Sequence, residues 1–517
     1  MKNGEGLNLA LYRIGNQAIR WIGAACLFPM AVFAFFFHAE VSMDISSMEK
    51  VTFERNSLSV YVCLLAVCTL LYFGRNVLKR IDSKKFFICM SAFFLAAGFV
   101  FVMGAGTDLR ADPYEVYTAA MAFSSGDFSS MAEGGYLFHY PHQLGLVTYE
   151  RLLTGLFGTP KVLFLGNLAF FILNNWMCWR IGREIFGPGR LMENTVILLS
   201  FLFLPQFFFM AFLYGLLPGF SMLFLAFYAQ LLLLKTGKTR YFFVMVLAAA
   251  LANLLRNNSM IGLIAMVIIF CMEGMRRKRL LLFVYGAAMI FTVMAAGKAL
   301  DRWYEAESGY AVGAGEPKLL WIAMGLQENE ERMDGWYNGF NWYTYEDNGC
   351  DQKVCEEIAM DSLRESAAKF KASPAYAARF FGRKTASTWC DPLFQSIWSG
   401  PLGALDQRLD NDRLRPVYEN GRVHGAIRDF SGAWLAFVYA MTLIFLAAVR
   451  PRESGELLGI LFFVGGFLFH LFWETKSQYV YPYVFSMIPY AAYMTRRADE
   501  VFFRKRQDIL EAEGAKE

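Results

Sequence analysis

Residues 86–116 read FFICMSAFFLAAGFVFVMG (86–104) and then AGTDLRADPYEV (105–116). The first part is uncharged and apolar, and as a helix it is long enough to cross about 30 Å of hydrocarbon. The second part follows at once with three carboxylates, at Asp108, Asp112 and Glu115. The stretch therefore predicts a transmembrane helix that delivers a group of acidic side chains to one membrane surface.

Apolar runs of this kind recur along the whole chain. Of its 517 residues, 56% are hydrophobic and only 18% are charged, whereas soluble domains have roughly 25% charged residues. The chain also has 51 Phe, 25 Tyr and 11 Trp, which suit helix packing in lipid and anchoring at the interface. This composition excludes a soluble enzyme, a disordered chain and a secreted disulfide scaffold, and nothing in it points to nucleic acid as a partner. It predicts an all-α polytopic membrane protein in contact with membrane lipids.

The runs predict about twelve transmembrane helices. Their expected ranges are 17–38, 57–74, 86–104, 161–181, 191–209, 212–234, 241–255, 258–273, 279–298, 430–449, 456–473 and 478–495. No small-residue cleavage site follows 17–38, so we expect a retained anchor there and not a removed signal peptide.

Charge asymmetry sets the expected topology. Basic residues cluster in the loops near 75–85, 180–190, 235–240, 276–279, 450–452 and 496–506. All of these loops are cytoplasmic together only if the apolar stretch 142–158, which Glu150 and Arg151 interrupt, does not cross the membrane. We therefore expect that stretch to be an amphipathic helix on the outer interface of the plasma membrane, with both termini in the cytoplasm.

This topology divides the chain into six regions. They are N-terminal membrane helices (1–104), an outer catalytic-type loop with the interfacial helix (105–160), central membrane helices (161–298), an extracytoplasmic domain that is α-rich or mixed (299–429), C-terminal membrane helices (430–497) and a cytoplasmic tail (498–517). The extracytoplasmic domain contains Cys350, Cys355 and Cys390, the three cysteines expected in an oxidising compartment. A Cys350–Cys355 bridge is one option, and three free thiols are the other.

The first outer loop carries two groups of candidate residues. Pro113 is compatible with a helix start, with Asp112 as its N-cap. An ordinary cap with solvated acids would have the same spacing. The following segment GGYLFHYPHQ places His139, Tyr140 and His142 where they would either bind phosphate and shuttle protons or serve as interfacial anchors.

Two further groups lie at the outer ends of later spans. The segment LLRNNSM contains Arg256 and Asn257, and WETKSQYVYPY contains Glu474, Lys476 and Tyr479. An arginine at that depth needs a carboxylate, a carbonyl or a lipid phosphate, unless it extends to the headgroups. Because the expected topology brings these groups and both groups of the first loop to one face, their convergence favours a functional site.

In their order and sidedness these residues resemble the membrane glycosyltransferases of the GT-C superfamily, in particular the protein O-mannosyltransferase and lipid A aminoarabinose transferase group. The family's outer loop pattern D-E/Q-x-x-Y-x-x-A is similar to the run from Asp112 through Tyr117 to Ala120. Its Tyr-Pro segment and L-F-G helix end resemble 135–141 and 156–158. Its later arginine resembles Arg256, and its C-terminal E-x-x-x-R-Y-x-x-P element resembles 474–482.

Three features depart from the family pattern. Two spans precede the helix before the acidic loop, where one is common, which suggests a separate branch. The connection FLYGLLPGF lacks an acidic residue that many relatives carry, so Asp108 or Glu115 would have to replace it. YPHQ stands where K-P-P is frequent, so His139 or His142 would have to replace that lysine.

The resemblance implies inverting transfer of a sugar from a polyprenyl-phosphate donor to an outer acceptor, which would be a cell-wall or surface glycan, a lipid-linked saccharide or a protein. In this scheme Asp112 is the base, with Asp108 and Glu115 as further catalytic candidates. The donor phosphate would contact Arg256, Lys476, His142 and His139, and substrate would contact Tyr117, Tyr140, Asn257, Glu474 and Tyr479. No cofactor is required. Some branches bind a divalent metal, for which Asp108 and Asp112 would supply oxygen ligands.

Two other function classes remain open at this stage. A transporter or flippase of lipid-linked saccharides has a similar composition, but it would concentrate polar groups near the bilayer midplane, where Asn174 and Asn175 are the most notable here. A polysaccharide polymerase or O-antigen ligase also acts on the outer face, but usually relies on later loops than the acidic one at 105–116. A non-catalytic assembly subunit is a further alternative.

Overall fold

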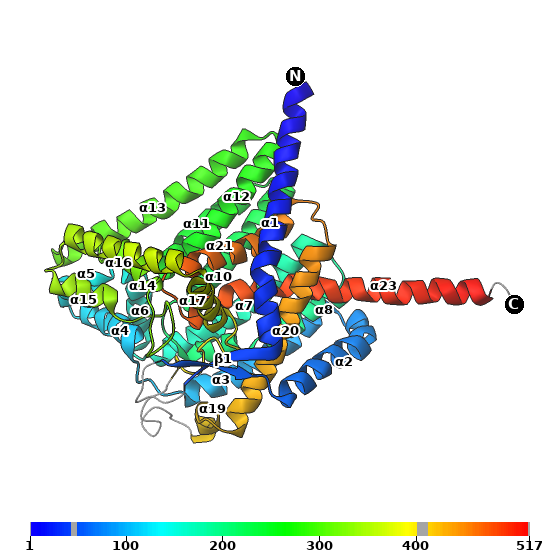
Figure 1. Cartoon of the computed structure of the whole chain (residues 1–517), viewed down its shortest axis with the longest axis horizontal. Coiled ribbons are helices and arrows are strands. Elements are labelled where there is room, and N and C mark those ends of the chain that lie inside the picture. The colour runs from blue at the N-terminus through cyan, green and yellow to red at the C-terminus, as the bar shows by residue number, and fades with distance from the viewer. Residues whose placement is uncertain (1, 43–48, 401–411, 515–517) are drawn as a thin grey trace.

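The computed structural model describes residues 2–42, 49–400 and 412–514, and these ranges form an almost entirely helical molecule (Figure 1). Nine helices within these ranges are long and apolar enough to cross a membrane. They are α1 (Lys2–Phe36, of which Asn8–Phe36 qualifies), α2 (Leu58–Arg80), α3 (Ser83–Gly104), α7 (Lys161–Phe186), α10 (Leu216–Thr236), α12 (Ser259–Arg277), α13 (Leu280–Ser308), α20 (Arg422–Ala448) and α21 (Leu458–Phe472), the last together with the 3-10 turn Ser454–Leu457 that precedes it. The protein is therefore an all-α polytopic membrane protein, as the composition predicts.

Fewer helices of the described ranges meet these criteria than the twelve spans expected from the sequence. The run 191–209 forms two short helices, α8 (Arg190–Phe201) and α9 (Leu204–Phe208), bent by 49°, which make a tenth span if they are taken together. The run 241–255 is the shorter helix α11 (Arg240–Leu255). The run 478–495 is broken into a 3-10 turn, α22 (Tyr481–Phe485) and the start of α23 (Ile488–Gly514), because Pro482 and Pro489 each remove a helical donor.

The stretch 142–158 contains a single 14-residue helix, α6 (Leu144–Phe157). At 1.5 Å per residue it is roughly 21 Å long, too short to span the hydrocarbon. Its two charged residues are accommodated by protein: Glu150 is buried, and Arg151 forms an ion pair of 2.7 Å with Glu307 at the end of α13. Helix α6 is thus part of the 105–160 loop and packs against other parts of the protein.

A two-stranded hairpin between α1 and α2 is the element that the sequence analysis missed. Strands β1 (Phe37–Val41) and β2 (Val51–Arg55) pair antiparallel, with Ala39 opposite Phe53. The backbone amide of Ala39 donates to Cys390 and that of Val51 donates to Arg332, so the hairpin is attached to the 299–429 segment. The alternation VTFER signals a strand, but the adjoining apolar run masks it.

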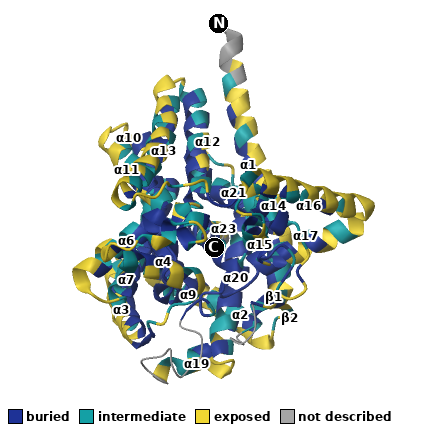
Figure 2. Cartoon of the chain, turned by 90° about the vertical axis from the view of Figure 1, so that its left-hand side faces the viewer, coloured by how far each residue is buried: buried dark blue, intermediate teal, exposed yellow. Residues whose placement is uncertain are grey.

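The described parts of the 299–429 segment are mostly helical, with loops at 310–317 and 326–339, and they pack directly on the bundle. Its helices are α14 (Lys318–Gly325), α15 (Phe340–Asp347), α16 (Gln352–Ala372), α17 (Pro374–Trp389) and α19 (Arg415–Tyr418). Figure 2 shows α16 projecting from the body with many exposed residues, whereas the interior of the bundle is buried. Cys350, Cys355 and Cys390 are all free thiols, so the structure contains no Cys350–Cys355 bridge.

The two polar segments lie together at one end of the molecule. In Figure 1 the helices α4 (Ala111–Ser124), α5 (Tyr136–His139) and α6 lie beside α14–α16 at the left. The amino end of α1 points to the top of the view and the carboxyl end of α23 to the right. Segments far apart in the sequence therefore meet at the end of the bundle away from both termini.

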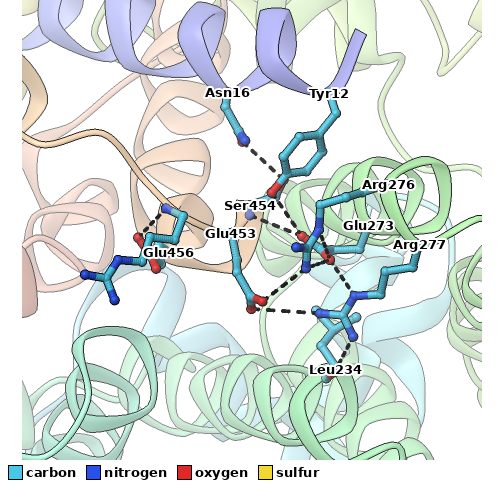
Figure 3. Close-up of polar contacts among 10 residues, drawn as sticks. Tyr12, Asn16, Leu234, Glu273, Arg276, Arg277, Glu453, Ser454 and Glu456 are labelled. Atoms are coloured by element: carbon cyan, nitrogen blue, oxygen red, sulfur yellow. Dashed lines mark hydrogen bonds and ion pairs between the residues drawn. The ribbon is translucent and has the colours of Figure 1, made fainter. Parts of the chain in front are cut away.

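A second polar cluster joins α1, α12 and the turn before α21 at another end of the bundle (Figure 3). The buried carboxylate of Glu273 accepts hydrogen bonds from Arg276 at 2.6 Å and Arg277 at 2.7 Å, and from the backbone amide of Ser454 at 3.2 Å. Tyr12 of α1 donates to the same carboxylate at 3.4 Å. Its partners satisfy this buried charge, which identifies the cluster as a clamp between helices.

Candidate functional site

Seven polar residues from five separate loops meet where the two polar segments join. We call this group the central cluster. Its members are Asp112, Tyr140, Tyr214, Arg256, Tyr337, Glu474 and Tyr479. Five of them were candidates from the sequence, and Tyr214 and Tyr337 were not. The fold therefore brings together residues that are up to 367 positions apart in the chain, from Asp112 to Tyr479.

Asp112 lies in the first turn of α4. The helix begins at Ala111 and its N-cap is Arg110, so the expectation that Asp112 is itself the N-cap is wrong. The difference arises at Ala111, whose φ of 52° is in the left-handed region that non-glycine residues rarely adopt. This turn directs the half-buried Asp112 while the amino end of the helix favours its negative charge.

Tyr214 connects Asp112 to the rest of the central cluster. It lies in the short loop before α10, and its hydroxyl accepts a hydrogen bond of 3.1 Å from Gln143. Burial, and then the negative charge of Asp112, raise the pKa of Tyr214. After burial, the Asp112 carboxylate also raises the pKa of Tyr337, and it adds a smaller contribution at Tyr140, where burial and Glu316 come first. Asp112 is thus surrounded by tyrosine hydroxyls that stay protonated.

Arg256 approaches the same tyrosine from the loop between α11 and α12. Its guanidinium donates to the backbone carbonyl of Tyr214 at 3.1 Å and lies 4.5 Å from the centre of the Tyr214 ring. It also lies 5.5 Å from the centre of the Tyr479 ring. A Cβ on Gly219 would come within 2.6 Å of the Arg256 Cβ, so only glycine allows this approach of α10. The Arg256 guanidinium is thus positioned by a hydrogen bond to the Tyr214 carbonyl and by the rings of Tyr214 and Tyr479.

Glu474 supplies a second carboxyl group to the central cluster, and this group is buried. Its Oε1 has no hydrogen-bond partner among the described residues. Burial raises the pKa of Glu474 to about 7, against the opposing charge of Lys476. Lys384 of α17 is a nearby buried cation, whose ammonium donates to the carbonyls of Leu471 at 3.1 Å and Trp473 at 2.9 Å. Burial lowers the pKa of Lys384 to about 7.

Lys476 is held by an ion pair that the sequence did not indicate. Its ammonium lies 2.9 Å from Oε1 of Glu49, just before β2, and the other oxygen of Glu49 lies 2.8 Å from Arg332. Both cations lie over the ring of Tyr337, at 5.5 Å and 5.3 Å from its centre. Lys476 therefore borders the central cluster, but in this arrangement its charge is shared with Glu49.

His139 is engaged on both ring nitrogens. Nδ1 lies 3.0 Å from a carboxylate oxygen of Glu316, and Nε2 lies 2.5 Å from one of Glu346. The ring stacks on Trp342 with a centroid distance of 3.9 Å, and the side chain is buried. This geometry joins the first polar segment to the 299–429 segment and does not present His139 to a donor phosphate.

His142 lies between positive charges. Burial by the surrounding protein, and then the charges of Arg256 and Lys318, lower the pKa of His142 to about 4, although part of its side chain remains accessible to solvent. The two nearby cations disfavour protonation of the imidazole whatever its solvent access. At neutral pH the imidazole is uncharged, so it offers a hydrogen bond and not a cation to a phosphate.

The remaining candidates lie outside the central cluster. Asp108 and Glu115 are exposed, and Asp108 lines a small surface recess beside Arg110 and Phe212. Tyr117 lies on α4 within range of Glu150 of α6, where burial and then that carboxyl group raise its pKa. Asn257 is exposed next to Arg256. Of the three acids in 105–116, only Asp112 is a member of the cluster.

A divalent metal would need more ligands than the expected pair supplies. Asp108 and Asp112 offer two carboxylates, and no group of three or more His, Cys, Asp or Glu residues suited to a metal gathers in the described ranges. A cation held by Asp108 and Asp112 would therefore take its remaining oxygen ligands from water and substrate phosphate, as Mg²⁺ commonly does.

Several residues of the site could not have been chosen from the sequence. Glu49 lies in a loop between spans, and Arg332, Glu316 and Lys384 are scattered through a charged segment without a recognisable motif. Tyr214 had a weak signal, because it interrupts an apolar run directly before Gly215. The chain matches no protein-family model and no curated protein.

Proposed function

We propose that this protein is an integral membrane glycosyltransferase of the GT-C type. In this proposal it moves a sugar from a polyprenyl-phosphate donor to an extracytoplasmic acceptor, with inversion at the anomeric carbon, and the central cluster faces the outside of the plasma membrane. The observation that carries the proposal is the meeting of Asp112 and Arg256 around Tyr214. A carboxylate and a guanidinium on two sides of one residue suit a reaction that releases a proton and a phosphate.

The proposed reaction assigns one role to each charged group. The acceptor hydroxyl oxygen forms a bond to the anomeric carbon while the bond from that carbon to the phosphate oxygen breaks. Asp112 takes the hydroxyl proton, and the bonding electrons leave with the lipid phosphate. Arg256 stabilises the departing phosphate with charge-assisted hydrogen bonds, in a partly buried setting that strengthens them.

The tyrosines and Glu474 have supporting roles in the proposal. The protonated hydroxyl of Tyr140 interacts with Glu316 and that of Tyr214 with Asp112, so in the proposal they orient these carboxylates and offer their oxygens as acceptors to sugar hydroxyls. Glu474, with its pKa of about 7, would exchange between donor and acceptor near neutral pH and pair with a sugar hydroxyl in either form. Lys476 already shares its charge with Glu49, which weakens its attraction for a further anionic group.

A donor panel tests the reaction class directly. The purified protein is incubated with polyprenyl phosphates that carry different radiolabelled sugars, together with a membrane extract as the acceptor source. The proposal predicts that one label leaves the lipid and appears in a product that no longer partitions with polyprenyl phosphate. If the label instead crosses vesicle membranes while still attached to the lipid, the protein is a flippase and the proposal is wrong.

A further inference from the structure

A recess in the 299–429 segment lies on the far side of the helix that borders the central cluster. It has a volume of about 470 Å³, within the range of ~300–1,000 Å³ that is common for small-ligand sites. Its walls come from the loop before α15, from α15 itself and from α16. The lining residues used below are Gln327, Asn338, Phe340, Tyr343, Asp347 and Asn348.

The chemistry of this lining suits a neutral polyhydroxylated ligand. Phe340 and Tyr343 provide aromatic faces, on which the C–H face of a sugar ring packs. Carboxamides and the carboxylate of Asp347 offer both donors and acceptors, which vicinal hydroxyls require. None of the residues that line the recess is Lys, Arg or His, so it has no cation for a phosphate.

The lining is held in place before any ligand binds. The Asn338 amide donates to Gln327 at 2.8 Å, and the Gln327 amide donates to Ser362 at 2.9 Å. The side chain of Tyr343 is 65% exposed, yet its ring lies against Gly339, where a Cβ would come within 2.7 Å of the ring. An exposed aromatic ring with a fixed orientation provides binding area at low entropic cost.

The two faces of the 337–348 segment connect the recess to the site. On one face, Asn341 donates to Glu316 at 2.6 Å, Trp342 stacks on His139, and Tyr337 belongs to the central cluster. On the other face, Asn338 and Tyr343 line the recess. Asn341 also lies 3.5 Å from the hydroxyl of Tyr140, a member of the central cluster, so α15 has the recess on one face and the edge of the cluster on the other.

We propose that this recess binds a neutral sugar unit of a glycan acceptor, beyond the unit that receives the transferred sugar. The inference rests on the proposed function for its account of the acceptor, and it adds the class of ligand that the acceptor must contain. An acceptor long enough to pass around α15 would occupy both places at once, so the recess would favour glycans over single sugars.

The test measures binding without any donor lipid, so that it is independent of turnover. The whole protein is kept in lipid nanodiscs, because common detergents with sugar headgroups would compete. Saturation-transfer NMR and calorimetry are carried out with neutral disaccharides of glucose, galactose, mannose, rhamnose and N-acetylglucosamine, with glucuronic acid and inorganic phosphate as anionic probes. The inference predicts that at least one neutral disaccharide binds with a millimolar or lower Kd, and that neither anion displaces it.

Three variants locate the binding. Tyr343→Ala should weaken it at least about 10-fold, because the stacking face is lost, while Tyr343→Trp should retain it. Tyr310→Ala removes another exposed tyrosine of the same segment, outside the recess, and should leave binding unchanged. The inference is overturned if no neutral disaccharide binds, if an anion competes, or if Tyr343→Ala binds as the wild type does. Failure of this binding test would not change the result of the donor panel. If the donor panel fails instead, sugar binding to the recess can still be measured.

Discussion

Replacing Glu474 by glutamine should stabilise the protein at neutral pH and have no such effect in acid. Burial raises the pKa of this carboxyl group from 4.5 to about 7 in the folded protein, so the folded state binds a proton more tightly than the unfolded chain does. The contribution of the neutral acid to stability is fully present below pH 4.5 and is lost as the pH rises to about 7. Glutamine mimics the neutral form at every pH.

The size of the effect follows from the two pKa values. Each tenfold change in proton affinity corresponds to ~1.36 kcal/mol, which places the loss on the order of 3 kcal/mol. An unfolding entropy of ~2.1 cal/mol/K per residue converts this energy into about 3 °C in Tm for a chain of this length. The Glu474→Gln variant should therefore melt about 3 °C above the wild type at pH 7.5, and at the same temperature as the wild type near pH 4.5.

The assay is thermal unfolding of the protein in nanodiscs across this pH range. Glu330→Gln, at an exposed position of the 299–429 segment, is the matched control and should show no pH-dependent gap. Lys384 also titrates near pH 7, and the charge of Glu474 raises its pKa, so the gap between the two proteins reports both groups together. A gap that does not change with pH, or a variant that melts below the wild type at pH 7.5, would show that Glu474 is a paired carboxylate and would refute the reasoning.

Three further predictions concern the donor, the helix clamp and the topology. Arg256→Ala should lower kcat/KM for the lipid donor roughly 10- to 100-fold without lowering Tm much, because a charge-assisted hydrogen bond is worth about 1.5–3 kcal/mol, and unchanged kinetics would assign Arg256 to the headgroup region. Glu273→Gln should destabilise the protein by about 3 kcal/mol, measured by thermal unfolding, because Arg276 and Arg277 lose a buried partner. In a cysteine-free background, Tyr343→Cys and Thr159→Cys should react with an impermeant thiol reagent in intact cells while Lys238→Cys should not, and the reverse pattern would overturn the proposed sidedness.

The helices were predictable because lipid imposes a simple rule on their composition. A span such as α3 needs only length and apolarity, and both are visible in the sequence. The rule fails where an apolar run is long enough to span but its helix is interrupted, as at Pro482. It also fails where a helix ends before its apolar run does, as at Phe36, after which β1 begins. In those places backbone chemistry and tertiary pairing decide the structure, and a hydropathy pattern contains neither.

The sequence predicted which residues group together at the candidate site better than it predicted which of them are in contact. Sidedness alone brought Asp112, Arg256 and Glu474 into one group, and the structure places them together. The ion pair between Glu49 and Lys476 and the stacking of His139 on Trp342 each join residues at least 200 positions apart. Such pairings depend on how loops cross in space, which a single sequence does not encode in any local pattern.

The transfer rate of an Asp112→Asn variant tests the proposed function most directly, because Asp112 is the proposed catalytic base. Asp112→Asn keeps the size of the side chain but cannot accept a proton at neutral pH, so transfer from the donor lipid should fall on the order of 100-fold or more while the Tm and donor binding stay near those of the wild type. Asp108→Asn and Glu115→Gln are the matched controls, since both residues are exposed and lie outside the central cluster. They should keep most of the transfer rate. Near-normal transfer by Asp112→Asn would contradict the account, whether or not one of the control variants loses activity.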